Sequence, residues 1–127
     1  MVLWCIIYLV KFTIKIPGKV SLNTAMRKHY RAVNALKQEW HTVVCEAKPP
    51  TWKGNFPVNV LYHYHLHGKL IDSTNAGFMT KSCEDALVSY GVFPDDNPKF
   101  VRMSSNITDK CSKGEIDYVE VTITPCS

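Results

Sequence analysis

The sequence predicts a single α+β domain over residues 1–127, with a mixed β-sheet and two main helices in two layers. The chain has 127 residues, 46% of them hydrophobic, which suits one compact domain with one core. Apolar and polar residues alternate over 58–66, as in a strand, whereas apolar residues recur at helical spacing over 23–47 and 75–90. Proline and glycine separate these segments, so helices and strands interleave along the chain.

The first ten residues, MVLWCIIYLV, are apolar and run into the alternating KFTIKI. We expect a strand, fully buried where both faces are apolar, that ends at Pro17 and Gly18. A signal peptide is the alternative, but no basic segment precedes the apolar run and no small-residue cleavage site follows it. Ten apolar residues are also too few to span a bilayer, so no membrane segment is expected.

The first helix is predicted from a cap at Asn23 or Thr24 to about Ala47. Its apolar stripe consists of Ala25, Tyr30, Val33, Leu36, Trp40 and Val44. Basic residues lie largely off this stripe, namely Arg27, Lys28, Arg31 and Lys37. They form either an ordinary solvated face or a surface that contacts a nucleic-acid backbone. Residues 48–57, KPPTWKGNFP, are rich in proline and predict a loop.

The strand over 58–66 has two distinct faces. One set of alternate residues is apolar or aromatic and suits the core: Val58, Val60, Tyr62, Tyr64 and Leu66. The other set is Asn59, Leu61, His63, His65 and His67, so the histidines point away from the core. Neighbouring histidines on this face are about 7 Å apart. Two neighbours can share a zinc ion, but then either the third histidine must lean a long way or a different element must supply the remaining ligands. A zinc site at His63, His65 and His67 and a half-exposed polar sheet face are both open interpretations.

The second helix fits residues 75–90, with Ser73 or Thr74 as its cap and Gly91 as its terminator. Its buried stripe is predicted to be Met79, Cys83, Ala86, Leu87 and Tyr90. Two more strands are expected at 99–103 and 118–123. The polar loop between them carries Lys110 and Lys113, which could reach a ligand.

Charge is unevenly distributed along the chain. Residues 1–70 carry ten of the fifteen basic residues and two acids, whereas residues 71–127 carry five basic residues and nine acids. A basic half favours polyanionic partners, and the acids near it would be explained by a divalent metal. The five cysteines are widely spread and include no CxxC pair, which is typical of reduced thiols in a cytoplasmic protein.

The segment from Asp72 to Asp96 places an acid at the strand exit, a lysine in the next helix and two acids after it. Lys81 follows Thr74 by seven residues, so both lie on one helix face, and a helical side chain leans toward the N-terminus. Asp95 and Asp96 can return to the same edge. These groups suit a magnesium and phosphate site. The plainer interpretation is that Asp72 caps the helix and PDDNP is an ordinary turn.

The same segment resembles the RusA family of Holliday-junction resolvases, which are metal-dependent endonucleases of phages and prophages. The family pattern is DxDN, a helical lysine, DAL, a glycine with apolar neighbours, and DD at the next turn. This chain has DSTN at 72–75, Lys81, DAL at 85–87, YGVF at 90–93, and DD at 95–96. Earlier, IKIPGK and YRAV suit the opening elements, and YVEVTI resembles the closing strand.

The resemblance implies a role for each matched residue. Asp72 corresponds to the first acid of DxDN and Asn75 to its asparagine, while Lys81 is the lysine of the catalytic site. Asp96, together with Asp95, supplies the acids after the helix. Asp85 corresponds to the aspartate of DAL and is structural. Apart from the resemblance, Asn75 and Glu84 are expected nearby as helpers if the remaining acids hold the metal. The implied cofactor is Mg²⁺, with Mn²⁺ as a substitute, and the implied assembly is a homodimer on a four-way DNA junction. Phosphates would be contacted by Arg27, Lys28, Arg31, Lys69, Lys110 and Lys113.

The chain departs from the pattern at Thr74, where the family has its second acid. A threonine offers a hydroxyl but no charge, so one of the usual carboxylates is missing. Two outcomes are open: a Mg²⁺-dependent junction endonuclease that works with the remaining acids, or a weakened or inactive relative that binds branched DNA. A zinc protein built on the three histidines is the third hypothesis.

Overall fold

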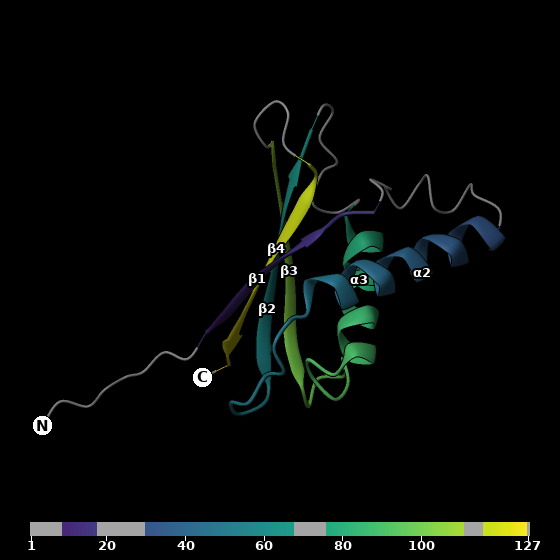
Figure 1. Cartoon of the computed structure of the whole chain (residues 1–127). Helices are drawn as coiled ribbons and strands as arrows, with labels where there is room; N and C mark the ends of the chain where they lie inside the picture. The colour runs from purple at the N-terminus through teal and green to yellow at the C-terminus, as the bar shows by residue number, and fades with distance from the viewer. Residues whose placement is uncertain (1–8, 18–29, 68–75, 111–115, 127) are drawn as a thin grey trace, which may run out of the picture.

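The computed structural model describes residues 9–17, 30–67, 76–110 and 116–126. Along these ranges the elements are β1 (Val10–Lys15), α2 (Tyr30–Ala47), β2 (Val58–Leu66), α3 (Gly77–Tyr90), β3 (Val101–Lys110) and β4 (Tyr118–Pro125). The four strands form one mixed sheet (Figure 1). The α+β class with two main helices is confirmed.

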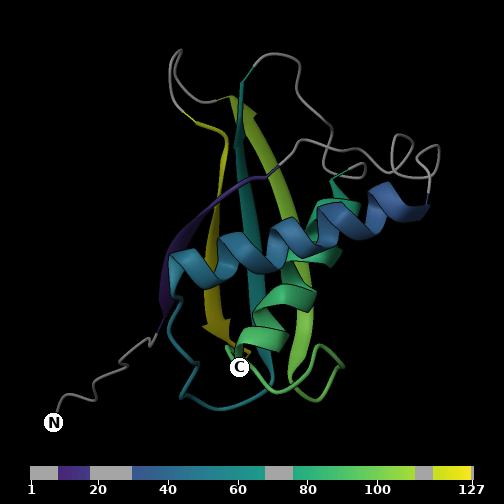
Figure 2. The same cartoon turned by 45° about the vertical axis from the view of Figure 1, so that its right-hand side comes forward.

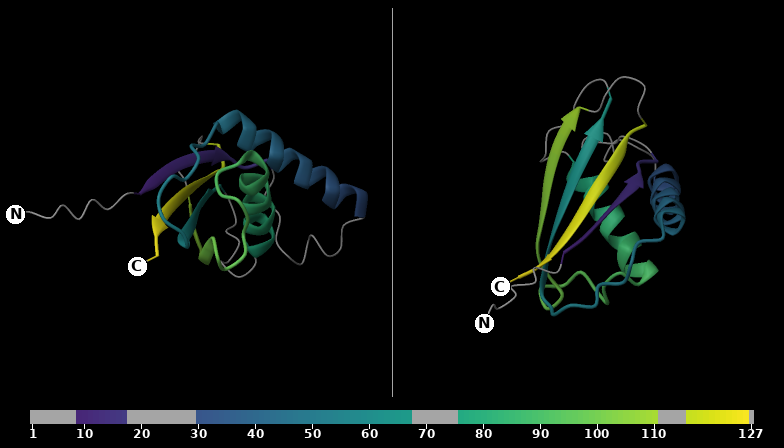
Figure 3. Two further views of the ribbon diagram at one scale, coloured as in Figure 1. Left: turned by 90° about the horizontal axis from the view of Figure 1, so that it is seen from below. Right: turned by 60° about the vertical axis from the view of Figure 1, so that its left-hand side comes forward.

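The strand order in the sheet is β1-β4-β2-β3. β4 lies antiparallel to both β1 and β2, whereas β2 and β3 are parallel. The two parallel strands are joined through α3, which is the crossover helix that a parallel pair requires. The right-hand view of Figure 3 shows the four strands side by side in this order.

Both helices cover the same face of the sheet (Figures 1 and 2). The core lies between them and the sheet, with Trp40 and Val44 of α2, Met79 and Leu87 of α3, and alternate residues of β2 and β4 buried in it. Trp52, in the loop after α2, is also buried, and its backbone N–H donates to the carbonyl of Val92. No described helix lies over the opposite face of the sheet, which we call the open face.

The two faces of β2 are as predicted. Every residue of the apolar set is buried, while the residues between them are partly exposed on the open face. This confirms that the histidines point away from the core. The loop over 48–57 is confirmed as well.

Other boundaries differ from the predictions. Leu9 precedes β1 and is 50% exposed, so the buried strand does not include it. Residues 1–8 lie outside the described ranges, and so does the predicted start of the first helix. β3 continues to Lys110 because it pairs with β2 along its length. Lys110 is therefore the last residue of a strand and not part of a loop. The polar sequence of β3 suits a strand at the sheet edge.

The ends of α3 also differ in part. Ala76 precedes the described helix and makes no side-chain cap hydrogen bond, and the predicted caps Ser73 and Thr74 lie outside the described ranges. Tyr90 is 40% exposed and not buried, because it is the last helical residue and its side chain extends past the core. Gly91 ends the helix as predicted: its φ is 103°, and its N–H donates to the carbonyls of Leu87 and Val88.

Replacing Gly91 by alanine should lower the free energy of unfolding by about 1–2 kcal/mol, because a Cβ is unfavourable in the left-handed region. Gly77→Ala is the matched control. An added Cβ there meets no atom within 4 Å, and alanine is the better helix former, so this variant should be neutral or more stable. Urea unfolding of both variants measures the difference. Equal losses at the two positions would contradict the left-handed cap.

The described cysteines, Cys45, Cys83 and Cys126, are free thiols, and Cys5 and Cys111 lie outside the described ranges. Cys83 is fully buried, and burial raises the pKa of its thiol. It therefore behaves as a small apolar core residue. Among the described helices, none has the length and apolarity needed to cross a membrane.

Candidate functional site

Two hydrogen-bonded pairs determine how α3 lies on the sheet. The hydroxyl of Tyr62 donates to Oε2 of Glu84 at 2.6 Å, and the hydroxyls of Tyr64 and Thr80 are 2.6 Å apart. Residues i and i+2 of a strand are about 7 Å apart, and residues i and i+4 of a helix are about 6 Å apart along its axis. The spacing of Tyr62 and Tyr64 along β2 therefore matches the spacing of Glu84 and Thr80 along α3. α3 thus runs antiparallel to β2 with Thr80 and Glu84 facing the sheet.

β3 completes this buried network. The hydroxyl of Ser104 donates to the same Oε2 of Glu84 at 2.7 Å, and the hydroxyl of Thr80 donates to Oδ1 of Asn106. Glu84 is only 8% exposed, and its side chain lies between α3 and the sheet. It is therefore not the helper beside the acids that was predicted. Burial raises the pKa of Tyr62 well above its ordinary value, which keeps the phenol a neutral donor.

Lys81 points away from the sheet and meets two acids. Its Nζ is 2.8 Å from Oδ2 of Asp96 and 3.2 Å from Oδ1 of Asp85. Asp96 comes fifteen residues later, in the loop after α3, which turns back toward the helix. The hydrogen bond to Asp96, followed by the one to Asp85, raises the pKa of Lys81, and the same contact with Lys81 lowers the pKa of Asp96. Each shift reflects the mutual stabilisation of the two charges.

Asp95 has a different role in the same loop. Its Oδ1 accepts from the backbone N–H of Asp96 at 2.7 Å, and its Oδ2 accepts from Nδ2 of Asn97 at 2.9 Å. Both carboxylate oxygens of Asp95 thus hold the turn that presents Asp96 to Lys81. Of the two adjacent acids, Asp96 is the one whose side chain meets the lysine.

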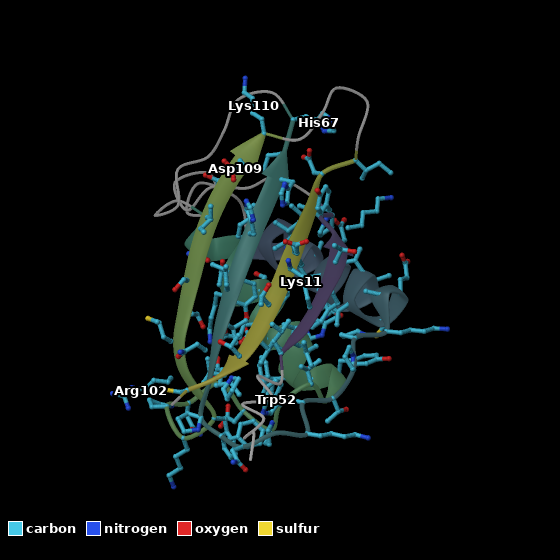
Figure 4. All side chains as sticks on the ribbon, turned by 90° about the vertical axis from the view of Figure 1, so that its left-hand side faces the viewer. Lys11, Trp52, His67, Arg102, Asp109 and Lys110 are labelled. Atoms are coloured by element: carbon cyan, nitrogen blue, oxygen red, sulfur yellow. The ribbon has the colours of Figure 1, made fainter. Side chains whose placement is uncertain are left out.

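Several predicted site residues lie outside the described ranges. These are Asp72, Thr74 and Asn75 of the DSTN segment, and Arg27, Lys28, Lys69 and Lys113 among the basic residues. Arg31 is in α2, but its side chain is likewise not described. Lys110, at the exposed end of β3, is labelled in Figure 4. The structure thus brings together Lys81, Asp95 and Asp96 from the predicted site.

The three histidines of the open face have three different partners. Nε2 of His63 is 2.6 Å from Oδ2 of Asp109 on β3, and Nδ1 of His67 is 2.8 Å from Oδ1 of Asp117. The ring of His65 stacks on Tyr118 of β4, with centroids 4.4 Å apart. Figure 4 shows this face, with His67 and Asp109 labelled near one end.

Among the described residues, a group able to hold a metal ion is formed by His63, His65 and Glu120. The prediction from the sequence had His67 as the third member and missed Glu120. The alternation in YVEVTI does place Glu120 on one face with Tyr118 and Thr122. It cannot show that Glu120 lies directly opposite His63, because that depends on the pairing of β4 with β2.

No protein-family model matches the chain, and no curated protein matches it well enough to count as a relative. The resemblance to junction resolvases therefore remains an expectation from the ordered motifs of the sequence.

Proposed function

We propose that the protein is a metal-dependent endodeoxyribonuclease that hydrolyses phosphodiester bonds in branched DNA, four-way junctions included, during recombination or repair. The observation that carries this proposal is the contact between Lys81 and Asp96, at 2.8 Å. These are the lysine and the acid that the motif pairs, and nothing in local periodicity requires them to meet. Asp95 supports the proposal by holding the turn on which Asp96 lies.

The donor set suits Mg²⁺, with Mn²⁺ as a substitute. Carboxylate oxygens are the ligands that these cations prefer, and Asp96, Asp95 and Asp72 would supply them. Asp96 would hold the ion while its Oδ2 contacts Lys81. When bound, the metal supplies Lewis-acid stabilisation of a phosphoryl oxygen and a water of lowered pKa.

Among the residues of the chain, Lys81 acts on the phosphate and the acids beside it hold Lys81 in position. The ammonium group of Lys81 stabilises the negative charge that develops as the phosphodiester is attacked. Asp96 and Asp85 hold this ammonium from two sides, so that little reorganisation is needed during the reaction. Thr74 and Asn75 would support Asp72 at the strand exit.

The basic residues would hold the DNA. Phosphate contacts by Arg27, Lys28, Arg31, Lys69, Lys110 and Lys113 would make affinity fall steeply with salt, because each contact releases condensed counterions. A homodimer would present one acidic site to each of two strands of a junction. The protein would act in the cytoplasm, that of a bacterial host if a phage encodes it.

A second candidate function follows from Thr74, which stands where the family has an acid. With one carboxylate fewer, the protein would bind branched DNA without cutting it.

One assay separates these candidates. A synthetic four-way junction and a linear duplex of the same sequence are incubated with the protein in Mg²⁺, Mn²⁺ or a chelator, and both binding and incision are followed. We expect incision of the junction alone, in either metal. Binding without incision, with cutting restored by Thr74→Asp, would favour the second candidate. Absence of junction-specific binding in all three conditions would contradict both.

A further inference from the structure

The open face of the sheet carries a second group of ligand-type side chains. His63 and His65 come from β2 and Glu120 from β4, and strand pairing sets Glu120 directly opposite His63. Lys81 and Asp96 belong to α3 and its following loop, on the helix-covered side, so the sheet separates the two groups. The proposed nuclease reaction makes no use of these histidines.

The three residues are close enough to share an ion. One ligand atom from each lies within 4.8 Å of the others, and the two imidazole rings are 4.1 Å apart and tilted by 35°. Zinc takes nitrogen and oxygen ligands at about 2 Å in a tetrahedron, which sets ligand atoms about 3.3 Å apart. To bind one ion, the ligand atoms would have to move closer to one another by up to about 1.5 Å. Side-chain rotation on a partly exposed face can supply this movement.

Both imidazoles are already oriented by neighbours. Asp109 holds Nε2 of His63 at 2.6 Å, as carboxylates do beside metal-ligating histidines. His65 is stacked on Tyr118 with an angle of 11° between the rings. Nε2 of His65 is shielded from solvent and has no hydrogen-bond partner among the described residues. A shielded nitrogen without a partner is unfavourable, and a metal ion would satisfy it.

One contact competes with an ion at this position. Nζ of Lys11 on β1 lies 3.5 Å from Oε1 of Glu120, and the side chain of Lys11 is 54% exposed. An exposed ion pair of this kind is weak, so a divalent ion would displace the lysine easily.

We propose that His63, His65 and Glu120 form a binding site for a zinc-type transition-metal ion that joins β2 to β4 on the open face. The mixed nitrogen and oxygen set suits zinc better than magnesium, which prefers oxygen alone. Three protein ligands leave one coordination position for water or another small ligand. Glu120 and Tyr118 also line a surface hollow with Thr13, Lys15 and Ile116, so this position is next to solvent.

The test is calorimetric titration of the untagged, chelator-treated protein with Zn²⁺ alone, with Co²⁺ binding followed by visible absorption to report the ligand number. One ion per chain is expected. His65→Ala and Glu120→Gln should lose most of the affinity, and Asp109→Asn about tenfold, since it removes only the orienting contact. Lys11→Met should bind about twofold to fivefold more tightly, because it removes the competing cation.

His67→Ala is the matched control, because it changes a histidine of the same strand end that pairs with Asp117 instead. It should bind zinc like the wild type. The proposal is overturned if the wild type binds no zinc, or if His67→Ala loses as much affinity as His65→Ala. Circular dichroism of each variant shows whether affinity is lost with a metal ligand or because the protein has unfolded. If His65→Ala does not fold, Glu120→Gln, which is the most conservative change, is the variant that tests the proposal.

Discussion

Asp96→Asn is expected to reduce junction cleavage by about 100-fold or more while junction binding is retained. The substitution keeps the shape of the side chain but removes the charge that holds Lys81 at 2.8 Å and that would hold the metal. Both effects act on the reaction and not on the phosphates that the basic residues contact. Single-turnover cleavage and gel-shift binding, measured on the same preparation, separate the two quantities.

Asp85→Asn is the matched control for this experiment. Asp85 contacts the same lysine at 3.2 Å, and the chemical change is identical, but Asp96 still holds the ammonium in this variant. We expect a loss of only a few-fold. If Asp96→Asn cleaves as fast as the wild type, the acid assigned to the site is wrong. Equal large losses in both variants would mean that Asp96 acts by positioning Lys81 and not by binding a metal.

Glu84→Ala is expected to lower the free energy of unfolding by about 3 kcal/mol. The variant removes a buried carboxylate that accepts from Tyr62 at 2.6 Å and from Ser104 at 2.7 Å, and it leaves both hydroxyls without their partner. It also opens a cavity between α3 and the sheet. Urea unfolding followed by circular dichroism measures the loss, and a double-mutant cycle with Tyr62→Phe measures the coupling between the two side chains.

The neighbouring Asp85→Ala provides the comparison, since it removes an acid from the exposed side of the same helix turn. Its ion pair with Lys81 is exposed on both sides, so a change within about 0.5 kcal/mol is expected. Similar losses at positions 84 and 85 would contradict the assignment of Glu84 to the buried network.

Local periodicity predicted the elements well where one face of an element is buried. The alternation of β2 placed the tyrosines in the core and the histidines on the open face, as the structure has them. The stripe of α3 was right for Met79, Cys83, Ala86 and Leu87. Burial repeats along one element with that element's own period, so these assignments needed no knowledge of the rest of the chain.

The prediction was weakest where an element depends on its neighbours. β3 is polar over RMSSNITD and extends to Lys110 because β2 supplies its hydrogen-bond partners. The sequence placed Glu84 among the acids near Lys81, yet it faces the other side of the helix, toward Tyr62. Tyr90 fits the apolar stripe but lies at the last helical position, beyond the core.

The sequence by itself determined which residues of β2 face the core, which apolar residues of α3 up to Leu87 do so, and which motifs are present between Asp72 and Asp96. Only the tertiary structure decided which side chains from different elements meet. Lys81 reaches Asp96 because the loop after α3 turns back toward the helix, and Glu120 lies opposite His63 because β4 pairs with β2 in one register. Such contacts depend on loop paths and strand registers, and neither is encoded in the period of a single element.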